Sequence, residues 1–151
     1  MHELLIIIAL SIVPISELRG ALIYAVTQHI PLSESLLPAI LANVLIVLVI
    51  YPQLEWLYKA CKRFLPPLGR FGDWVFEHTR RKHSASFERF KEFALVILVA
   101  IPLPLTGGWT GMAAAFVFGI KQRNALILIS SGVALSGLIM AALIQLGYTI
   151  F

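Results

Sequence analysis

Four apolar blocks, separated by short polar segments, make up most of the chain. Two of them are unbroken, at Leu36–Tyr51 and at Asn124–Tyr148, and each is long enough to cross a lipid bilayer as one helix. The first can continue through residues 53–58, which would place Trp56 at the membrane interface, and the second is expected to close at Gly147. The pattern therefore predicts two full transmembrane helices.

The other two blocks are interrupted near their middles. Leu4–Val26 is broken by Pro14 and by the charged residues that follow it, and Phe93–Ile120 is broken by a proline- and glycine-rich segment at residues 102–111. Each half-block offers about 8–12 apolar residues, which is too short to cross a bilayer and suits a half-helix that turns back. Because proline ends a helix and glycine lets the backbone turn, we predict two re-entrant helical hairpins.

The two broken blocks occupy matching places in the sequence. An ungapped offset of 88 residues pairs Pro14 with Pro102 and Gly20 with Gly108, and it lays the two unbroken blocks over each other. Interrupted segments at corresponding positions of two repeats mark the binding sites of many transporters. We therefore predict an all-α integral membrane fold of two inverted repeats, each a re-entrant helical hairpin followed by one full transmembrane helix. The expected single membrane domain, residues 1–151, divides into repeat 1 at residues 1–58, a cytosolic linker at 59–92 and repeat 2 at 93–151.

Composition supports a membrane location. Of the 151 residues, 59% are hydrophobic and 13% are charged, and the mean hydropathy is +0.87. Soluble domains are nearer to about 45–50% apolar and about 25% charged residues. The chain is therefore expected to be an integral membrane protein. Its single cysteine, Cys61, excludes an intrachain disulfide.

Positive charge is concentrated in one loop. Residues 52–92 hold nine Lys and Arg residues against five acids, and Lys121 and Arg123 follow the second broken block. If both broken blocks turn back, all of these positive residues share one side of the membrane; if the blocks cross, Lys121 and Arg123 lie opposite the loop. The positive-inside rule favours the first arrangement, with the loop in the cytosol, both termini outside and the chain in the cell membrane. Four full spans remain the alternative.

The end of this loop carries a further pattern. Within Ser86–Phe93, the aromatic residues Phe87, Phe90 and Phe93 recur at helical spacing among charged residues. This spacing predicts an amphipathic helix in the cytosolic headgroup layer, where it could contact anionic lipid headgroups. A solvated basic loop that only fixes the topology is the alternative.

Glu17 and Arg19 are ionisable residues inside an apolar block, where such residues cost roughly 2.5–3.5 kcal/mol on insertion scales and persist mainly where they have a function. On an irregular turn after Pro14 both side chains, with Ser16 beside them, could face one cavity. Arg19 could bind a phosphate or a carboxylate. Burial opposes the charged form of Glu17 while Arg19 and the start of the second half-helix favour it, so Glu17 is a candidate proton carrier. The alternative is a buried ion pair that only fixes the hairpin.

The second broken block carries no charge at its turn. Thr106, Trp109 and Thr110 provide hydroxyl groups and an indole N–H, and the Gly107–Gly108 backbone could cradle an anionic headgroup. The alternative is packing, with Gly107, Gly108 and Gly111 letting the two hairpin tips meet. The predicted binding residues are Glu17, Arg19, Ser16, Thr106, Trp109 and Thr110. The predicted structural residues of the two turns are Pro14, Gly20, Pro102, Pro104, Gly107, Gly108 and Gly111.

Several classes of function find no support in the sequence. The histidines at positions 29, 78 and 83 show no paired metal-ligand spacing. No nucleophile–base constellation and no dinucleotide fingerprint is present. We therefore expect no metal, no cofactor, no enzymatic activity and no nucleic-acid partner.

Two motifs carry a resemblance to a known family. With PISELRGAL at residues 14–22 and PLPLTGGWTGMAAAFVFG at residues 102–119, the chain resembles the small multidrug export family over nearly its whole length. That family is grouped by resemblance with the DedA superfamily, whose members pair two re-entrant hairpins with flanking spans and are associated with recycling of polyprenyl-phosphate carrier lipids. The resemblance implies a proton-dependent transporter or a protein similar to lipid scramblases. It also implies that Glu17 is the membrane-embedded acid and Arg19 the hairpin arginine; DedA proteins usually carry an arginine in the second hairpin too, and this chain has none there.

Three functions compete at this point. The first is transport of an anionic, polyprenyl-phosphate-type lipid or a small amphipathic solute through a site between the hairpin tips, coupled to protons. The alternatives are a small multidrug exporter of cationic compounds and a membrane scaffold that transports nothing. Because two spans bury little surface alone, a homodimer is also expected.

Overall fold

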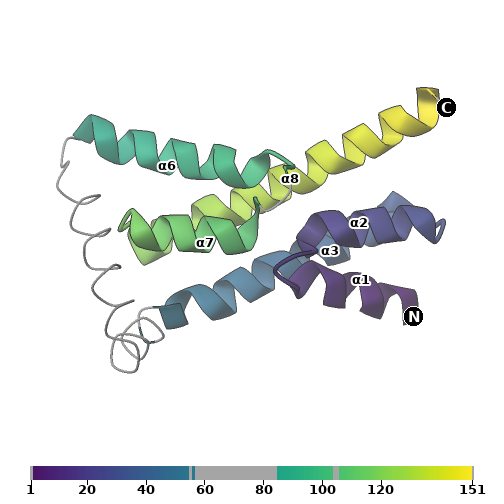
Figure 1. Ribbon diagram of the computed structural model, residues 1–151, viewed down its shortest axis with the longest axis horizontal. Coiled ribbons are helices and arrows are strands. Elements are labelled where there is room, and N and C mark those ends of the chain that lie inside the picture. The colour runs from purple at the N-terminus through teal and green to yellow at the C-terminus, as the bar shows by residue number, and fades with distance from the viewer. Residues whose placement is uncertain (1, 55, 57–84, 104–105, 151) are drawn as a thin grey trace.

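The computed structural model describes residues 2–54, 56, 85–103 and 106–150, and these residues form helices joined by turns (Figure 1). In chain order the helices are α1 (His2–Ile12), α2 (Glu17–Thr27), α3 (Leu32–Ile50) with a 3-10 turn η1 (Tyr51–Gln53), α6 (Ala85–Ala100), α7 (Gly108–Val117) and α8 (Gln122–Ile150). Within the described ranges the fold is all-α, as the sequence predicts.

Two helices are long and apolar enough to cross a membrane. They are α3 together with η1, over Leu32–Gln53, and α8 over Gln122–Gly147. Only 33% and 28% of their apolar windows are buried, whereas a core helix of a soluble protein would be mostly covered. Leucines such as Leu41 and Leu45 are 58% and 60% exposed, which suits contact with lipid. The chain is a membrane protein with these two transmembrane helices.

Each remaining pair of helices is separated by a non-helical segment that begins just before a proline. Helix α1 ends at Ile12, two residues before Pro14, and α6 ends at Ala100, two residues before Pro102, because the residue before a proline avoids helical backbone. We call residues 13–16 the first break and the described residues 101–103 and 106–107 the second break. In Figure 1 the α1–α2 pair extends from the end where both termini lie, the α6–α7 pair extends from the opposite end, and the two breaks lie near the middle.

The second helix of each pair ends in the same way. His29 follows α2 with φ of 56°, and Gly119 follows α7 with φ of 64°. After α2, the next two backbone N–H groups, of His29 and Ile30, donate to carbonyls of the last turn; after α7, those of Gly119 and Ile120 do the same. This is the Schellman closure, in which a residue with left-handed backbone satisfies the last carbonyls of a helix. The ends of α2 and α7 therefore share one backbone conformation.

Small residues of α8 let it approach a helix of each half closely. A Cβ atom at Gly132 of α8 would meet the side chain of Val99 on α6, and one at Gly137 would meet Ile40 on α3. Such contacts replace the hydrophobic driving force that is absent between helices in lipid. These two glycines therefore serve packing inside this chain.

Three boundaries differ from the prediction or lie outside the described residues. Helix α6 runs without a break from Ala85, so the described part of the predicted amphipathic segment is the first half of that helix and no separate element. Helix α8 continues past Gly147 to Ile150, because a single glycine does not end a helix that no proline follows. The rest of the basic linker, residues 57–84, lies outside the described part.

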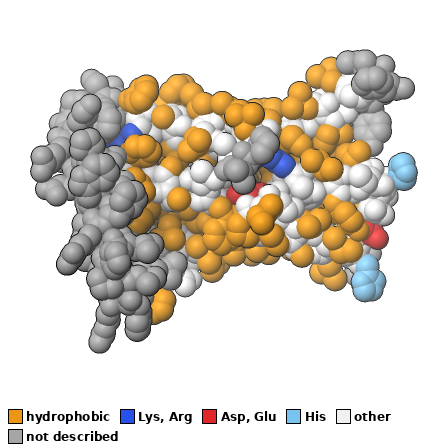
Figure 2. All heavy atoms as spheres, in the orientation of Figure 1, with side chains coloured by type: hydrophobic (Ala, Val, Ile, Leu, Met, Phe, Trp, Pro, Cys, Tyr) orange, Lys and Arg blue, Asp and Glu red, His pale blue; other side chains and the backbone are white. Residues whose placement is uncertain are grey.

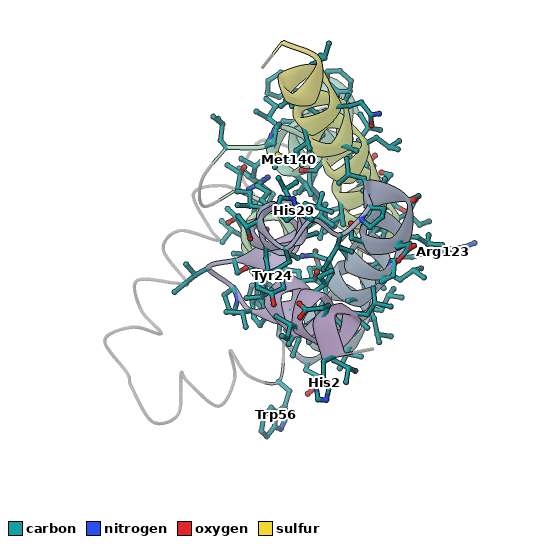
Figure 3. The ribbon with its side chains drawn as sticks, turned by 90° about the vertical axis from the view of Figure 1, so that its right-hand side faces the viewer. His2, Tyr24, His29, Trp56, Arg123 and Met140 are labelled. Carbon is teal, nitrogen blue, oxygen red and sulfur yellow. The ribbon has the colours of Figure 1, made fainter. Side chains whose placement is uncertain are left out.

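Arg123, at the start of α8, projects away from the helices (Figure 3).

Candidate functional site

Glu17 opens helix α2, yet its carboxylate caps a different helix. The backbone N–H of Trp109, in the first turn of α7, donates to Glu17 Oε1 at 3.1 Å. Helix α7 has Gly107 at its N-cap and receives no cap from a side chain of its own. A carboxylate at a helix N-terminus is stabilised by the free N–H groups and by the helix dipole. With 6% of its surface exposed, Glu17 is a buried anion whose partner belongs to the other half of the chain.

The backbone on both sides of this contact is unusual. Glu17 has φ of 49°, a left-handed conformation that a residue with a side chain adopts at a cost of about 1–3 kcal/mol. Gly107 has φ of 154° and ψ of −153°, a region open essentially to glycine alone. A Cβ atom at Gly107 would also collide with the carboxylate of Glu17. The glycine is therefore required for two reasons: its backbone conformation and the close approach of the carboxylate.

Arg19 contacts carbonyl oxygens along the second break. Its Nη2 donates to the carbonyl oxygen of Ile101 at 3.0 Å, and its Nη1 donates to the carbonyl oxygens of Leu103 and Thr106. These carbonyls follow α6, where the helix dipole presents its negative end. Glu17 and Arg19 therefore meet opposite partial charges: the carboxylate contacts an N–H group at the N-terminus of α7, and the guanidinium contacts carbonyl oxygens of the second break, from Ile101 just after α6 to Thr106.

Trp109 makes a second bond in the reverse direction. Its indole Nε1 donates to the carbonyl oxygen of Ile12 at 3.0 Å, at the last turn of α1. That carbonyl lacks an intrahelical partner because α1 ends there. The first turns of α2 and α7 therefore each supply a side chain that satisfies a helix end of the other pair, and together they form one polar contact between two apolar pairs of helices.

The remaining predicted residues lie around this contact. The single proton of the Thr106 hydroxyl is shared between the carbonyl oxygens of Ile101 and Leu103, both at 2.9 Å, so this side chain ties Thr106 to the residues that follow α6. Ser16 lies so close to Gly20 that a Cβ atom there would meet its hydroxyl. Thr110 is half-buried on α7, and Pro104 lies outside the described residues.

A cavity opens beside the two breaks. We call it the tip cavity; it is lined by Pro14, Ile15, Ser16, Glu17, Arg19, Gly20, Ile23, Pro102, Thr106 and Met140. Counted over positions that the centre of a water molecule can occupy, its volume is about 320 Å³, the size of a small-molecule site. Ile15 and Ile23 on its wall are 86% and 55% exposed, so the cavity opens on the outside of the helix pairs. Figure 2 shows an acidic and a basic area close together near the middle of a face that is otherwise largely hydrophobic.

The geometry answers part of what the sequence leaves open. The structure brings Glu17, Arg19, Ser16 and Thr106 to one cavity and joins Trp109 to it by a hydrogen bond. At the glycine-rich turn, where the sequence suggests an anionic headgroup, the contact seen is with the carboxylate of Glu17, and a bound headgroup stays a prediction. Asn43 of α3 is also 1% exposed beside Gly108, and its side-chain nitrogen donates to the carbonyl oxygen of Ser11 on α1 at 2.9 Å. Its only signal in the sequence is a single amide in an apolar span.

The sequence also matches a known family. A family model described as "Putative small multi-drug export protein" matches residues 17–139. No curated protein and no solved structure matches the chain. The match confirms the resemblance predicted from the two motifs, whereas the further grouping with DedA proteins stays a prediction.

Proposed function

Because the chain belongs to the small multi-drug export family, we propose that it is a membrane transporter that moves small, cationic, amphipathic solutes through the tip cavity. The lining of that cavity carries the proposal. Most of its side chains are apolar, and its one carboxylate is Glu17. The guanidinium of Arg19 lines the same cavity, but its terminal nitrogens donate to three carbonyl oxygens. A ligand with an apolar body and a positive charge fits this combination best.

Protonation of Glu17 couples the transport of the solute to the movement of protons. A charge-assisted hydrogen bond is roughly twice as strong as a neutral one, so a protonated Glu17 holds the N-terminus of α7 less tightly. Proton and cationic solute then compete for one carboxylate. The same proton loosens the contact between the two breaks, which links the release of the solute to a movement of the helix pairs.

The proposed membrane arrangement is two inverted repeats whose α1–α2 and α6–α7 pairs are re-entrant hairpins. Its support is that the two pairs extend from opposite ends of the molecule (Figure 1) and that α2 and α7 end in the same closure. The exposed Ile15 and Ile23 then face lipid, and an amphipathic solute reaches the cavity sideways from the bilayer. We place the chain in the cell membrane, with the basic loop in the cytosol, and propose a homodimer.

An anionic carrier lipid remains the rival substrate because Arg19 lines the cavity. For a phosphate to bind there, Arg19 would have to release carbonyls of the second break and the buried Glu17 charge would lie close to the phosphate. Both conditions make this substrate less favourable than a cation. A scaffold without transport requires neither charge to face a cavity.

The test is flux in proteoliposomes, with a fluorescent cationic dye and a labelled polyprenyl phosphate measured in parallel. Wild type is compared with Glu17→Gln, which keeps the shape of the side chain and removes its charge. Glu34→Gln is the matched control, because Glu34 lies exposed in the first turn of α3. We expect dye flux that depends on a pH gradient and that falls about tenfold or more in Glu17→Gln, the ratio that corresponds to about 1.4 kcal/mol.

The other outcomes of the flux measurement would favour a different substrate, a different residue or a different function. Lipid flux without dye flux would overturn the cationic substrate and show that the anionic lipid is transported instead. Equal dye flux in wild type and Glu17→Gln, at equal protein levels, would remove Glu17 from the mechanism. No flux of either compound, with the protein folded, would favour the scaffold.

A further inference from the structure

Three buried polar atoms of the described chain have no hydrogen-bond partner there: Arg19 Nε, Asn43 Oδ1 and Ser136 Oγ. Asn43 is 1% exposed and Ser136 is 3% exposed. The amide nitrogen of Asn43 donates to the carbonyl oxygen of Ser11 at 2.9 Å, so the orientation of its side chain is fixed. A buried polar atom without a partner costs about 1–3 kcal/mol, and three atoms in one place call for a common explanation.

All three residues line one small cavity, distinct from the tip cavity, which we call the seam cavity. Glu17, Gly107 and Gly108 also line it, so it lies where α2, α3, α7 and α8 meet. Counted over the positions that the centre of a water molecule can occupy, its volume is about 10 Å³. A cavity that holds one water needs roughly 10–15 Å³ on this measure. The seam cavity therefore has room for one water-sized ligand.

The charges around the cavity decide which ligand that is. A metal cation would lie against the guanidinium of Arg19, and an anion would lie against the carboxylate of Glu17. A water molecule suits both charged groups, because it can accept and donate hydrogen bonds. It can accept from Arg19 Nε–H and from the hydroxyl of Ser136, and it can donate to Asn43 Oδ1. Its second hydrogen then remains for the carboxylate of Glu17.

We propose that the seam cavity binds one water molecule, which joins Arg19, Asn43 and Ser136 and donates a hydrogen bond to the Glu17 carboxylate. Asn43 and Ser136 are then positioning residues: through the water they hold the charged form of Glu17 ready for a cationic ligand. This role rests on the proposed function of the tip cavity. The presence of the water is independent of the proposed function, since it follows from the unpartnered atoms and the size of the cavity alone.

The first experiment looks for the water directly in wild-type protein in lipid nanodiscs. Magnetisation transfer between a long-lived water and the Nε–H proton of Arg19, assigned with Arg19→Lys, is expected in wild type. It should be lost in Ser136→Val, which puts methyl groups where the hydroxyl and the water lie. Ser131→Ala is the matched control and should keep the signal, because Ser131 is exposed on the same helix and its hydroxyl donates to Leu128 at 2.9 Å.

The second experiment measures the dye concentration that gives half-maximal flux. We expect Ser136→Val to raise it about tenfold, the ratio for one lost hydrogen bond to a charged group, with little change in maximal flux. Ser136→Ala, which leaves room for the water, should raise it less. A folded wild type without the magnetisation transfer would overturn the water site even if dye flux depends on Glu17. Water present with unchanged half-saturation in Ser136→Val would overturn the positioning role, whereas flux that ignores Glu17→Gln would overturn only the proposed function.

Discussion

The backbone N–H of Trp109 donates a hydrogen bond to the Glu17 carboxylate across 3.1 Å, so an acid of the first half of the chain caps a helix of the second. Arg19, two residues further on, donates to carbonyls on the other side of the same break. Alternate residues at the start of α2 thus contact an N–H group of α7 and the carbonyl oxygens of the second break. This explains the spacing of the two charges better than a simple ion pair does.

Gly107→Ala should destabilise the protein by about 1–3 kcal/mol. Alanine cannot adopt φ of 154° without strain, and its Cβ would displace the Glu17 carboxylate from the N-terminus of α7. Thermal unfolding in detergent measures the change. Gly147→Ala is the control: a Cβ there meets nothing within 4 Å, and alanine inside α8 should stabilise by up to about 1 kcal/mol. Equal stability of Gly107→Ala and wild type would contradict the contact.

Arg19→Ala should lower the free energy of unfolding by about 2 kcal/mol, because it leaves the carbonyls of Ile101, Leu103 and Thr106 without their charged donor. Arg19→Lys should lie between the two, since an ammonium group has its donors at one point and cannot span the same carbonyls. Denaturant unfolding in mixed micelles compares the three proteins. If Arg19→Ala were as stable as wild type, the guanidinium of wild-type Arg19 would not be needed to hold these carbonyls. It would then be available to an anionic substrate, which would favour the lipid.

Much of the fold could be predicted from sequence because it depends on local signals. Long apolar runs identify α3 and α8, and the prolines at positions 14 and 102 locate the ends of α1 and α6. The partners of Glu17 and Arg19 could not be predicted, because both belong to a segment more than 80 residues away in sequence whose position is set by packing. The surroundings of Asn43 depend on packing in the same way: a single amide in a span suggests an interhelical hydrogen bond, whereas the unpartnered atoms beside it are visible only in the fold.

Trp109→Phe should weaken the contact between the breaks by about 1 kcal/mol while leaving its apolar packing in place. The phenyl ring cannot donate to the carbonyl oxygen of Ile12, and that carbonyl then lacks a partner at the end of α1. The backbone bond to Glu17 is kept, so dye flux should persist with a lower unfolding temperature. Loss of flux at unchanged stability would instead indicate that the indole contacts the solute.

His29→Gly should stabilise the protein by about 1 kcal/mol. His29 closes α2 with φ of 56°, where a Cβ costs roughly 1–2 kcal/mol, and glycine removes that cost while losing some entropy in the unfolded chain. Gly119 closes α7 in the same conformation, so Gly119→Ala should destabilise by a similar amount. If the unfolding temperature rises in His29→Gly and falls in Gly119→Ala, the two closures are equivalent in backbone conformation and differ only in the residue that each contains. If His29→Gly were destabilising, the imidazole would have to make a contact at the end of α2 that outweighs its backbone strain.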